Sequence, residues 1–271
     1  MPELPEVETT RRGLLPNLSG RSFQKAVIRN PSLRWPVPMH LSSRLKGQLV
    51  STIERRGKYL LFRCNSGTLM IHLGMSGSLR IVSSEEPPMK HDHIDLIFNS
   101  GDVLRYHDPR RFGSFHWIKN GQEHPLLASL GPEPLSEKFD GNYLFEQSRR
   151  RSISVKQFIM DGKIVVGVGN IYASEALFLS GIRPGNASKR ISRERYFKLA
   201  ASIKIVLQSA IKQGGTTLRD FVGASGLPGY FSLKLNVYGR QGRKCNLCQA
   251  IIRCKVLGQR ASFYCKECQK N

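Results

Sequence analysis

The sequence predicts an α+β protein with several domains: a β-rich N-terminal part, a helical part, and a C-terminal segment built around cysteines. Three observations lead to this class. Short β-type segments alternate with glycine-containing turns before residue 130, a helical periodicity follows residue 150, and two CxxC motifs stand near the C-terminus. The 271 residues are 40% hydrophobic, which is enough to form more than one core.

The chain opens on MPELPE, a stretch with two interpretations. Pro5 followed by Glu6 predicts a helix start, because proline is favoured in the first turn and acids stabilise the positive end of the helix dipole. Removal of Met1 would also expose Pro2 as a secondary amine. An α-amine has a pKa of roughly 7.7–8.0, so its neutral fraction near pH 7 can attack an electrophilic carbon. Glu3 is then placed to act as an acid or a base.

Two β-hairpins are predicted before residue 130. Segments 58–63 and 68–73 flank one Asn-Ser-Gly turn, and segments 94–98 and 103–106 flank another. A Gly-Pro-Glu-Pro motif at 131–134 then marks a boundary. We therefore expect four regions: an N-terminal domain at 1–133, a linker at 134–151, a helical domain at 152–235 and a cysteine-bearing domain at 236–271.

Two helices are predicted in the helical domain. One is expected over 172–180 and ends at Gly181, and a longer one is capped by Ser192 and ends at Gly214-Gly215. The longer helix carries apolar residues three and four positions apart, which defines one buried face. The predicted face consists of Phe197, Ala200, Ile203, Leu207, Ala210 and Ile211.

Two CxxC motifs, separated by sixteen residues, consist of Cys245, Cys248, Cys265 and Cys268. This spacing is typical of a tetrahedral zinc site made of thiolates. Because protein groups fill all four positions, the predicted zinc is structural and not catalytic. Residues 237–271 also hold eight Lys or Arg and one acid, which favours phosphate contact; a solvated basic face is the alternative.

The chain is strongly basic, with 42 Lys and Arg against 20 Asp and Glu and a net charge of +22. Nucleic acid is therefore the first partner to consider, and a membrane surface is the alternative, although no basic amphipathic helix stands out. No apolar run of about 18 residues occurs, and the N-terminus lacks the features of a signal peptide. We expect a reducing cytosolic compartment, in which cysteines indicate metal sites or free thiols.

Several motifs together resemble one family. In order along the chain they are MPELPEVET, RGKYLL, IHLGMSG, HDPRRFG, VGVGNIYASEAL, QGGTT and the terminal CxxC pair. Over essentially its whole length the chain resembles bacterial formamidopyrimidine-DNA glycosylase. The resemblance implies an N-terminal β-sandwich with flanking helices, a helix–two-turn–helix module and a zinc-ribbon β-hairpin. It also implies a bifunctional base excision repair enzyme that removes oxidised purines, chiefly 8-oxoguanine and formamidopyrimidines, and then cuts the strand by β,δ-elimination.

The resemblance implies catalytic roles for four residues. Pro2 would attack C1′ of the damaged nucleoside and form a Schiff base, and Glu3 would protonate the opening sugar ring. Lys58 would assist base release or position a phosphate, although a strand lysine otherwise usually faces solvent. Arg260 would contact the phosphates around the lesion; a mobile surface arginine is the alternative. Glu6 has either a supporting role or the role of a helix-start acid.

An enzyme that acts on a base inside a duplex must extrude that base and fill the gap it leaves. Met75, Arg110 and Phe112 match the positions that fill this gap in the family. Their chemistry suits the task, because methionine is adaptable, phenylalanine can wedge between bases, and arginine presents a planar fork to the orphaned cytosine. Without the motif context, Met75 and Phe112 would be assigned to the core.

Three further residues match DNA-contact positions of the family: His91, Arg151 and Asn170. Asn170 begins a predicted helix after a glycine-rich turn, where backbone N–H groups favour an anion, and a helix cap is the alternative. Segment 216–230 is rich in glycine and is expected to form a mobile loop over the extruded base.

The expected partner is double-stranded DNA that contains oxidised bases, and the expected enzyme is a monomer of the bacterial cytoplasm, associated with the nucleoid. One structural zinc is expected, and the chemistry needs no redox cofactor. One alternative is a glycosylase for oxidised pyrimidines resembling endonuclease VIII; Leu4 and the gap-filling residues favour the purine type. The other alternative is a non-catalytic zinc-ribbon DNA-binding protein, which charge and zinc alone do not exclude.

Overall fold

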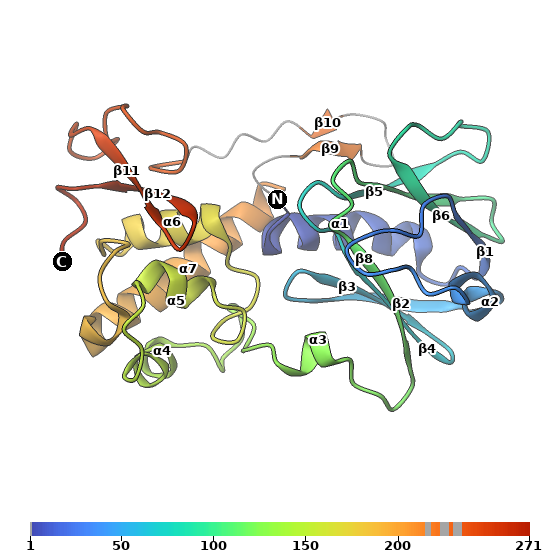
Figure 1. Ribbon diagram of the computed structural model, residues 1–271, viewed down its shortest axis with the longest axis horizontal. Helices are drawn as coiled ribbons and strands as arrows, with labels where there is room; N and C mark the ends of the chain where they lie inside the picture. Colours follow the sequence, from blue (N-terminus) through green and yellow to red (C-terminus); the bar gives the residue numbers. More distant parts are fainter. Residues whose placement is uncertain (1, 215–217, 223–227, 230–234) are drawn as a thin grey trace. The chain divides into compact units, whose positions relative to one another are not determined.

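The computed structural model describes residues 2–214, 218–222, 228–229 and 235–271 (Figure 1). The chain divides into two compact units. Unit 1 consists of Met1–Ala128 and Gly214–Ser232, and unit 2 of Ser129–Gln213 and Leu233–Asn271. Among the described residues, no helix is both long and apolar enough to cross a membrane.

The described part of unit 1 is built on two antiparallel four-stranded sheets. One sheet has the order β1 (Phe23–Ile28), β6 (Asp92–Phe98), β7 (Val103–His107) and β5 (Ser78–Val82). The other has the order β2 (Val50–Arg56), β3 (Tyr59–Cys64), β4 (Gly67–His72) and β8 (Ser114–Lys119). Both predicted hairpins are confirmed, as the pairs β3–β4 and β6–β7, with ends that differ by one or two residues.

Smaller elements complete this unit: α2 (Leu41–Leu45), α3 (Pro125–Ala128), β9 (Leu218–Val222) and β10 (Pro228–Gly229). β9 and β10 pair with each other, and β9 contacts β5. Both strands fall within 216–230, where the sequence predicts a loop, so part of that segment is paired strand. The rest of the predicted loop lies outside the described residues.

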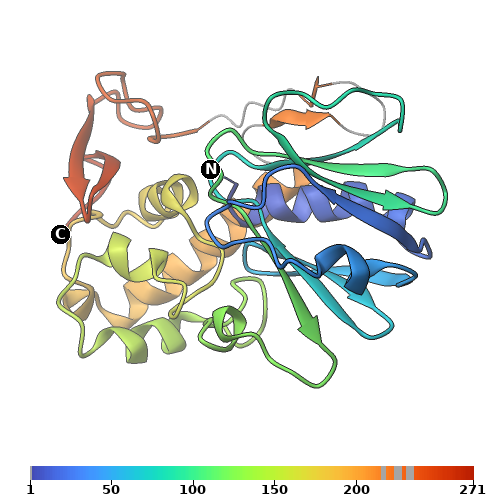
Figure 2. The ribbon, with the colours of Figure 1, turned by 45° about the vertical axis from the view of Figure 1, so that its right-hand side comes forward.

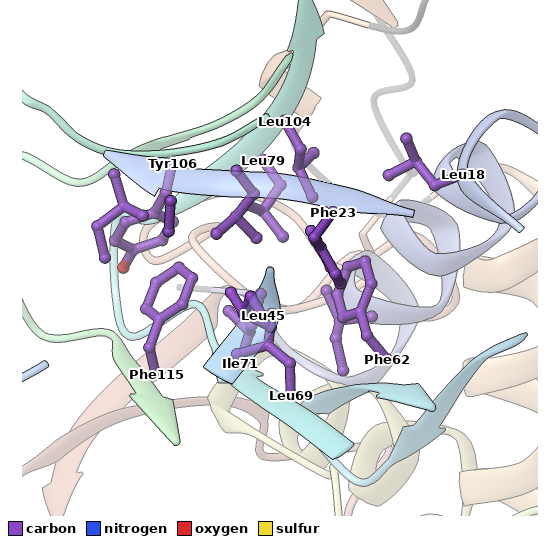
Figure 3. Packing of buried hydrophobic residues seen from close by; sticks show 14 of the residues in the cluster. Leu18, Phe23, Leu45, Phe62, Leu69, Ile71, Leu79, Leu104, Tyr106 and Phe115 are labelled. Carbon is purple, nitrogen blue, oxygen red and sulfur yellow. The ribbon is translucent and has the colours of Figure 1, made fainter. Parts of the chain in front are cut away.

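An apolar core fills the space between the two sheets and one helix, α1 (Leu4–Leu18), which runs along both sheets (Figure 2). Phe23 and Leu104 of the first sheet gather with Phe62 and Phe115 of the second (Figure 3). The helix contributes Val7, Leu14 and Leu18 to the same core. Full burial of such a side chain contributes about 1.5–3 kcal/mol, so these three residues alone fix the helix firmly.

Charged contacts fasten α1 to the second sheet. Oε1 of Glu8 lies 2.8 Å from both Arg11 and Arg12, and its Oε2 accepts from Nε of Arg55 on β2 at 3.1 Å. Burial alone would raise the pKa of Glu8, but the hydrogen bonds from Arg11 and Arg12, with the charges of Arg11 and Arg55, outweigh it and lower the pKa to about 2. Arg11 also donates to the Ile53 carbonyl at 3.2 Å.

Unit 2 is helical at its centre and contains α4 (Gly141–Ser148), α5 (Val155–Met160), α6 (Asn170–Leu179), the short 3₁₀ helix η1 (Ser188–Arg190) and α7 (Arg193–Lys212). The two predicted helices are confirmed as α6 and α7. Ser192 caps α7 as predicted, because its Oγ accepts from the Arg195 N–H at 3.3 Å. Both α4 and α6 pack against α7.

The structure corrects the predicted linker. Residues 134–151 carry helix α4, and Phe139 and Leu144 are fully buried in the helical core. Asp140 starts this helix, because its Oδ1 accepts from the Tyr143 N–H at 2.7 Å. The helix is only two turns long, so its apolar pattern is too short to stand out from sequence alone.

The structure also corrects one position on the buried face of α7. Phe197 is 46% exposed, whereas Tyr196 and Leu199 are fully buried. An apolar pattern with steps of three and four residues fits equally well when it begins at position 196. Tyr196 can be buried because its hydroxyl donates to the Ser188 carbonyl at 2.9 Å, so its polar end has a hydrogen-bond partner inside the core. Four predicted positions are buried, Ala200, Ile203, Leu207 and Ala210, and Ile211 is only partly buried.

The C-terminal hairpin consists of β11 (Ile252–Leu257) and β12 (Arg260–Cys265), and β12 contacts α6. Buried Glu175 of α6 joins the helices to this segment. Its carboxylate accepts from the N–H groups of Asn236, Val237 and Tyr238 at 2.8–2.9 Å. Because a buried carboxylate needs donors, these bonds hold the start of the cysteine-bearing segment on α6.

We predict that Glu8→Gln destabilises the protein near neutral pH by on the order of 2 kcal/mol, because it removes a buried charge shared by three arginines. The pKa of Glu8 in the folded state, about 2, lies below its ordinary value of 4.5. The stabilisation is therefore complete above pH 4.5 and is lost as the pH falls toward 2. Urea unfolding between pH 7 and pH 3 measures the difference between wild type and variant.

The matched control is Glu54→Gln. Glu54 pairs with Arg63 at 2.7 Å on the surface, with about half of its side chain exposed. An exposed pair contributes about 0–1 kcal/mol, so this variant should unfold almost as the wild type does. A Glu8→Gln deficit that stays constant from pH 7 to pH 3 would contradict the role assigned to the Glu8 carboxylate.

Candidate active site and nucleic-acid interface

The N-terminal residues lie at the first turn of the buried helix α1. Pro2 is partly exposed, and Glu3, the residue before the helix, is only 1% exposed. The Glu3 N–H donates to Oε2 of Glu6 at 2.8 Å, which is the bond of a helix capping box. Glu6 therefore serves the helix start, and the fixed backbone of Glu3 holds Pro2 at a defined place beside a buried carboxyl group.

Lys58 lies in the turn Gly57-Lys58, directly before β3 and not within the strand as the sequence predicts. The reason is register: Arg56 and Tyr59 form the last pair between β2 and β3, so two residues remain for the turn. Arg55 connects this turn to α1, because Nη1 donates to the Gly57 carbonyl at 2.9 Å while Nε binds Glu8. The turn that carries Lys58 is thus fixed to the same helix that carries Glu3.

His72, which the sequence analysis does not single out, lies close to this turn. Its ring centroid is 4.9 Å from that of Tyr59, and its Nδ1 accepts from the Gly74 N–H at 3.0 Å. Burial is the main cause that lowers the pKa of His72 to about 4, and the positive charges of Lys58 and Arg34 contribute to this lowering. The histidine is neutral at pH 7. Its place in IHLGMSG, three residues before Met75, is the sequence signal that could have drawn attention to it.

The residues that the sequence assigns to gap filling lie on two loops that touch through their backbones. Met75 is partly exposed, and Phe112 is 40% exposed. The guanidinium carbon of Arg110 lies 4.9 Å from the centroid of the Phe112 ring. Gly74 makes the close approach possible, because a Cβ there would lie 2.4 Å from the carbonyl carbon of Phe112. The core assignment of Met75 and Phe112 is therefore wrong, and both side chains are accessible.

An open cavity of about 650 Å³ lies beside the second loop. It is lined by Ser32, Leu33, Arg34, Arg110, Arg111 and Phe112. Three guanidinium groups, with no acid among the described lining residues, give this hollow a positive potential, which suits a polyanion. His91, the remaining predicted DNA-contact residue of unit 1, is partly exposed at the start of β6.

Unit 2 carries the other predicted contacts. Asn170 is the first residue of α6, as expected, and the helix follows an extended Gly169. Its Oδ1 is buried, and among the described residues it has no hydrogen-bond partner. A buried polar atom without a partner is rare in native proteins and marks a place that a ligand or water completes. Helix N-termini also favour anions, so both observations point to the same end of α6.

Arg260 opens β12 and is exposed, and a buried lysine supports the strand beside it. Lys156 of α5 is 1% exposed, and its Nζ donates to the Ala261 carbonyl at 2.8 Å and to Ser262 Oγ at 2.9 Å. These bonds fix the backbone next to Arg260. Lys156 could not be identified from the sequence, because a lone lysine in an apolar segment carries no local signal of burial.

Arg151 lies in unit 2 and is partly exposed. Its Nη1 is 3.4 Å from Asp161 Oδ2, a surface ion pair of modest strength. Its carbonyl accepts from Ser188 Oγ at 2.8 Å and from the Lys189 N–H at 3.1 Å. The backbone at Arg151 is therefore held against η1, and its guanidinium stays accessible.

The four predicted metal ligands come together in the C-terminal hairpin. The Sγ atoms of Cys245, Cys248, Cys265 and Cys268 all lie within 4.8 Å of one another. Cys245 and Cys268 are 3.8 Å apart, and Cys248 and Cys265 are 3.4 Å apart. Tetrahedral zinc with Zn–S bonds of about 2.3 Å requires sulfur–sulfur distances of about 3.8 Å. The cluster therefore fits a metal ion of this kind.

Comparison with known proteins shows what class this arrangement belongs to. Residues 1–115 match the profile of the formamidopyrimidine-DNA glycosylase N-terminal domain, and residues 130–222 match the profile of the formamidopyrimidine-DNA glycosylase H2TH domain. A β-sandwich that begins with Pro-Glu, followed by this helical module and a four-cysteine hairpin, defines a protein of the DNA glycosylase class built on these two domains. The predicted fold class is confirmed.

The individual relatives agree. Proteins named formamidopyrimidine-DNA glycosylase from Magnetococcus marinus and Stutzerimonas stutzeri are 56% and 57% identical, and each is matched over 100% of both chains. A Lactococcus lactis Fpg mutant in complex with Fapy-dG-containing DNA is 34% identical over 100% of both chains, with a TM-score of 0.91. The L. lactis protein with abasic-site DNA is 33% identical, covering 99% of this chain and 100% of that one, with a TM-score of 0.91. The chain belongs to the formamidopyrimidine-DNA glycosylase family.

We predict that Gly74→Ala destabilises unit 1 more than Gly20→Ala does. Both glycines have positive φ, +70° and +77°, but only at Gly74 would a Cβ meet backbone atoms within 4 Å. Left-handed strain costs about 1–2 kcal/mol at either site, and overpacking adds roughly 1–3 kcal/mol at Gly74. Denaturant unfolding of both variants measures the difference. Equal destabilisation would contradict the tight contact between the two loops.

Proposed function

We propose that this chain is a bifunctional DNA glycosylase and abasic-site lyase of base excision repair, which removes oxidised purines such as 8-oxoguanine and formamidopyrimidines. The observation that carries the proposal is full-length similarity to structures of Fpg bound to Fapy-dG-containing and abasic-site DNA, together with Pro2 and buried Glu3 at a fixed helix start. Its partner is double-stranded DNA. It acts as a monomer in the bacterial cytoplasm, where the DNA is.

Catalysis begins at the amine of Pro2 once Met1 has been removed. The amine nitrogen attacks C1′ of the damaged nucleoside, the glycosidic bond breaks, and its electron pair leaves with the base, which takes up the proton that the amine loses. Glu3 donates a proton to the ring oxygen as the sugar opens, which leaves an iminium between Pro2 and C1′. The buried position of Glu3 at the helix start supports this role, because it holds the carboxyl group next to the residue that carries the amine.

The iminium then drives strand cleavage. It acidifies the C2′ proton, whose removal expels the 3′ phosphate by β-elimination; a second elimination expels the 5′ phosphate. Lys58, on its fixed turn beside α1, supplies positive charge near the sugar and the leaving phosphate. Arg260 and Asn170 hold phosphates, one with its accessible guanidinium and the other at the start of α6.

Access to the damaged base requires extrusion from the stack. Met75 and Phe112 present exposed apolar surface to fill the gap, and Arg110 offers its donor fork to the orphaned cytosine. His91 and Arg151 add contacts to the phosphate backbone, for which the cavity lined by Arg34, Arg110 and Arg111 supplies the electrostatic attraction.

Zinc has a structural role in this proposal. The four cysteines would hold one Zn²⁺ with all positions filled by protein, which stabilises the hairpin that carries Arg260. The zinc supplies no catalytic water, because no ligand position is open. Reaction steps are therefore carried by the protein side chains and by the N-terminal amine.

We predict that borohydride traps the wild-type protein on a duplex with one 8-oxoguanine opposite cytosine, because the iminium is reducible. The adduct should map to Pro2 and should be absent with undamaged duplex. Pro2→Gly should keep DNA affinity and lose most base-excision turnover, since contacts to phosphate do not involve Pro2. Denaturing gels and peptide mass analysis measure both outcomes.

The N-terminal mass must first show that Met1 is absent, because a retained methionine blocks the amine. Preference for thymine glycol over 8-oxoguanine would replace the proposed substrate with an oxidised pyrimidine. Unchanged turnover in Pro2→Gly would refute Pro2 as the nucleophile. DNA affinity with no adduct on any damaged duplex would support the non-catalytic DNA-binding alternative.

We predict that Cys248→Ser lowers bound zinc well below one ion per chain and weakens DNA binding at least about tenfold, because the free energy of a structural zinc site is large compared with the stability of one hairpin. Cys254→Ser is the matched control, because Cys254 lies on β11 outside the cluster. Metal analysis and DNA titration measure both effects. Full DNA affinity without zinc would contradict the structural role.

A further inference from the structure

Asp108 follows β7 and is fully buried, although the proposed reaction gives it no task. Four donors surround its carboxylate. Oδ1 accepts from Ser76 Oγ at 2.6 Å and from the Arg110 N–H at 3.2 Å. Oδ2 accepts from the Tyr106 hydroxyl at 2.8 Å and from the Gly113 N–H at 3.0 Å. Two oxygen atoms thus bind four groups that come from two stretches of the chain, one at Ser76 and the other at 106–113.

Three of the four donors belong to the loops that carry the predicted gap-filling side chains, and the fourth, Tyr106, lies on β7. Ser76 directly follows Met75, and Gly113 directly follows Phe112. The Arg110 N–H, which also donates to Ser76 Oγ at 3.2 Å, belongs to the third gap-filling residue. The Asp108 carboxylate therefore fixes the backbone next to each of the three.

The backbone of Asp108 extends the same arrangement to a fourth predicted DNA contact. Its N–H donates to the His91 carbonyl at 3.0 Å, and its own carbonyl lies 2.8 Å from Nε2 of His93. That carbonyl also accepts from the Arg111 N–H at 3.2 Å, where φ of Arg111 is +56°. A non-glycine residue in this region needs support from its surroundings, and Asp108 supplies it.

The surrounding space leaves little room for a rearrangement. A Cβ at Gly113 would lie 1.8 Å from the Tyr106 hydroxyl, and one at Gly77 would lie 2.6 Å from it. Burial raises the pKa of Tyr106, and the neighbouring Asp108 charge raises it further, so the phenol remains a donor throughout the working pH range. Removal of a carboxylate oxygen here would leave buried donors without a partner, a loss the packing cannot relieve.

We propose that Asp108 is a positioning residue for base extrusion: its carboxylate holds Met75, Arg110 and Phe112 in the arrangement that enters the DNA stack. This inference depends on the proposed function. Asp108 is fully buried, and it acts through Ser76, Gly113 and the backbone of Arg110. Its loss should therefore impair the step in which a base leaves the duplex and spare the chemistry at the N-terminal amine.

The test is Asp108→Asn, which replaces one of the two acceptor oxygens by an NH₂ group. Each oxygen accepts from one backbone N–H, of Arg110 or of Gly113, so one of these two N–H groups loses its acceptor in either orientation of the amide. We expect excision of 8-oxoguanine from duplex DNA to fall at least about tenfold, since a buried donor without a partner is costly. Cleavage at a preformed abasic site in the same duplex should change by less than about threefold, because no base remains to be extruded. A 2-aminopurine beside the lesion should report slower unstacking in stopped-flow fluorescence.

Asp95→Asn is the matched control. Asp95 is also a buried aspartate of unit 1, but its carboxylate binds Arg105 at 2.9 and 3.0 Å and contacts none of the loop donors. It should lower thermal stability and leave the ratio of the two activities unchanged. Ser76→Ala removes one link on an accessible loop and should move the ratio in the direction of Asp108→Asn. If Asp108→Asn does not fold, the ratio measured for Ser76→Ala tests the proposed positioning role in its place.

The outcomes separate the inference from the function on which it depends. Wild-type protein that neither excises 8-oxoguanine nor cleaves the abasic site would overturn the proposed function and the inference together. Active wild type combined with equal losses in both reactions for Asp108→Asn, or with no loss in either, would overturn the inference alone. If Asp95→Asn changes the ratio of 8-oxoguanine excision to abasic-site cleavage as Asp108→Asn does, the inference is also overturned. The change would then result from lower protein stability and not from the position of the loops.

Discussion

Burial of α1 between the two sheets is the constraint on which the rest of the structure depends. Chain termini usually fray, yet the proposed chemistry needs a terminal amine at a fixed place. Val7, Leu14 and Leu18 anchor the helix in the core, and Glu8 anchors it through three arginines. The capping bond from Glu3 then carries this rigidity to the residue next to the amine. A residue next to the chain terminus, which is ordinarily mobile, is thereby held in place by the folded core.

The two loops that carry Met75, Arg110 and Phe112 are ordered in a different way. They bury little apolar surface, so glycine packing and hydrogen bonds to a carboxylate replace the hydrophobic anchoring that holds α1. Gly74 admits the backbone of Phe112, and Asp108 binds both loops at once. Unit 2 also uses a buried carboxylate in this way: Glu175 accepts from backbone N–H groups and so holds the start of the cysteine-bearing segment. Buried carboxylates in both units thus fix accessible side chains.

Features set by local chemistry were predictable from the sequence. The helix start at Pro5, the Asn-Ser-Gly hairpins and the spacing of the cysteines each depend on residues close in the chain. Lys58 was predicted in the strand but lies in the turn before it, because only the register of two strands decides where a turn begins. Lys156 and Glu175 gave no signal, since their partners lie far away in the sequence. The burial of Asp108 gave none either, because its bond to Ser76 on the other loop depends on the fold. Roles for the DNA-contact residues came from family resemblance, and local pattern alone would have placed Met75 in the core.

The buried start of α1 has a consequence for how such a protein can evolve. If the amine of Pro2 is the reactive group, no residue can be added before it without abolishing the reaction. The capping bond at Glu3 also fixes the position at which α1 begins, so the distance from the terminus to the helix cannot change. Upstream gene fusion, a common route to new domain combinations, is closed to this architecture. New modules can be acquired only within surface loops or beyond the C-terminal hairpin, so diversification should be strongly asymmetric along the chain.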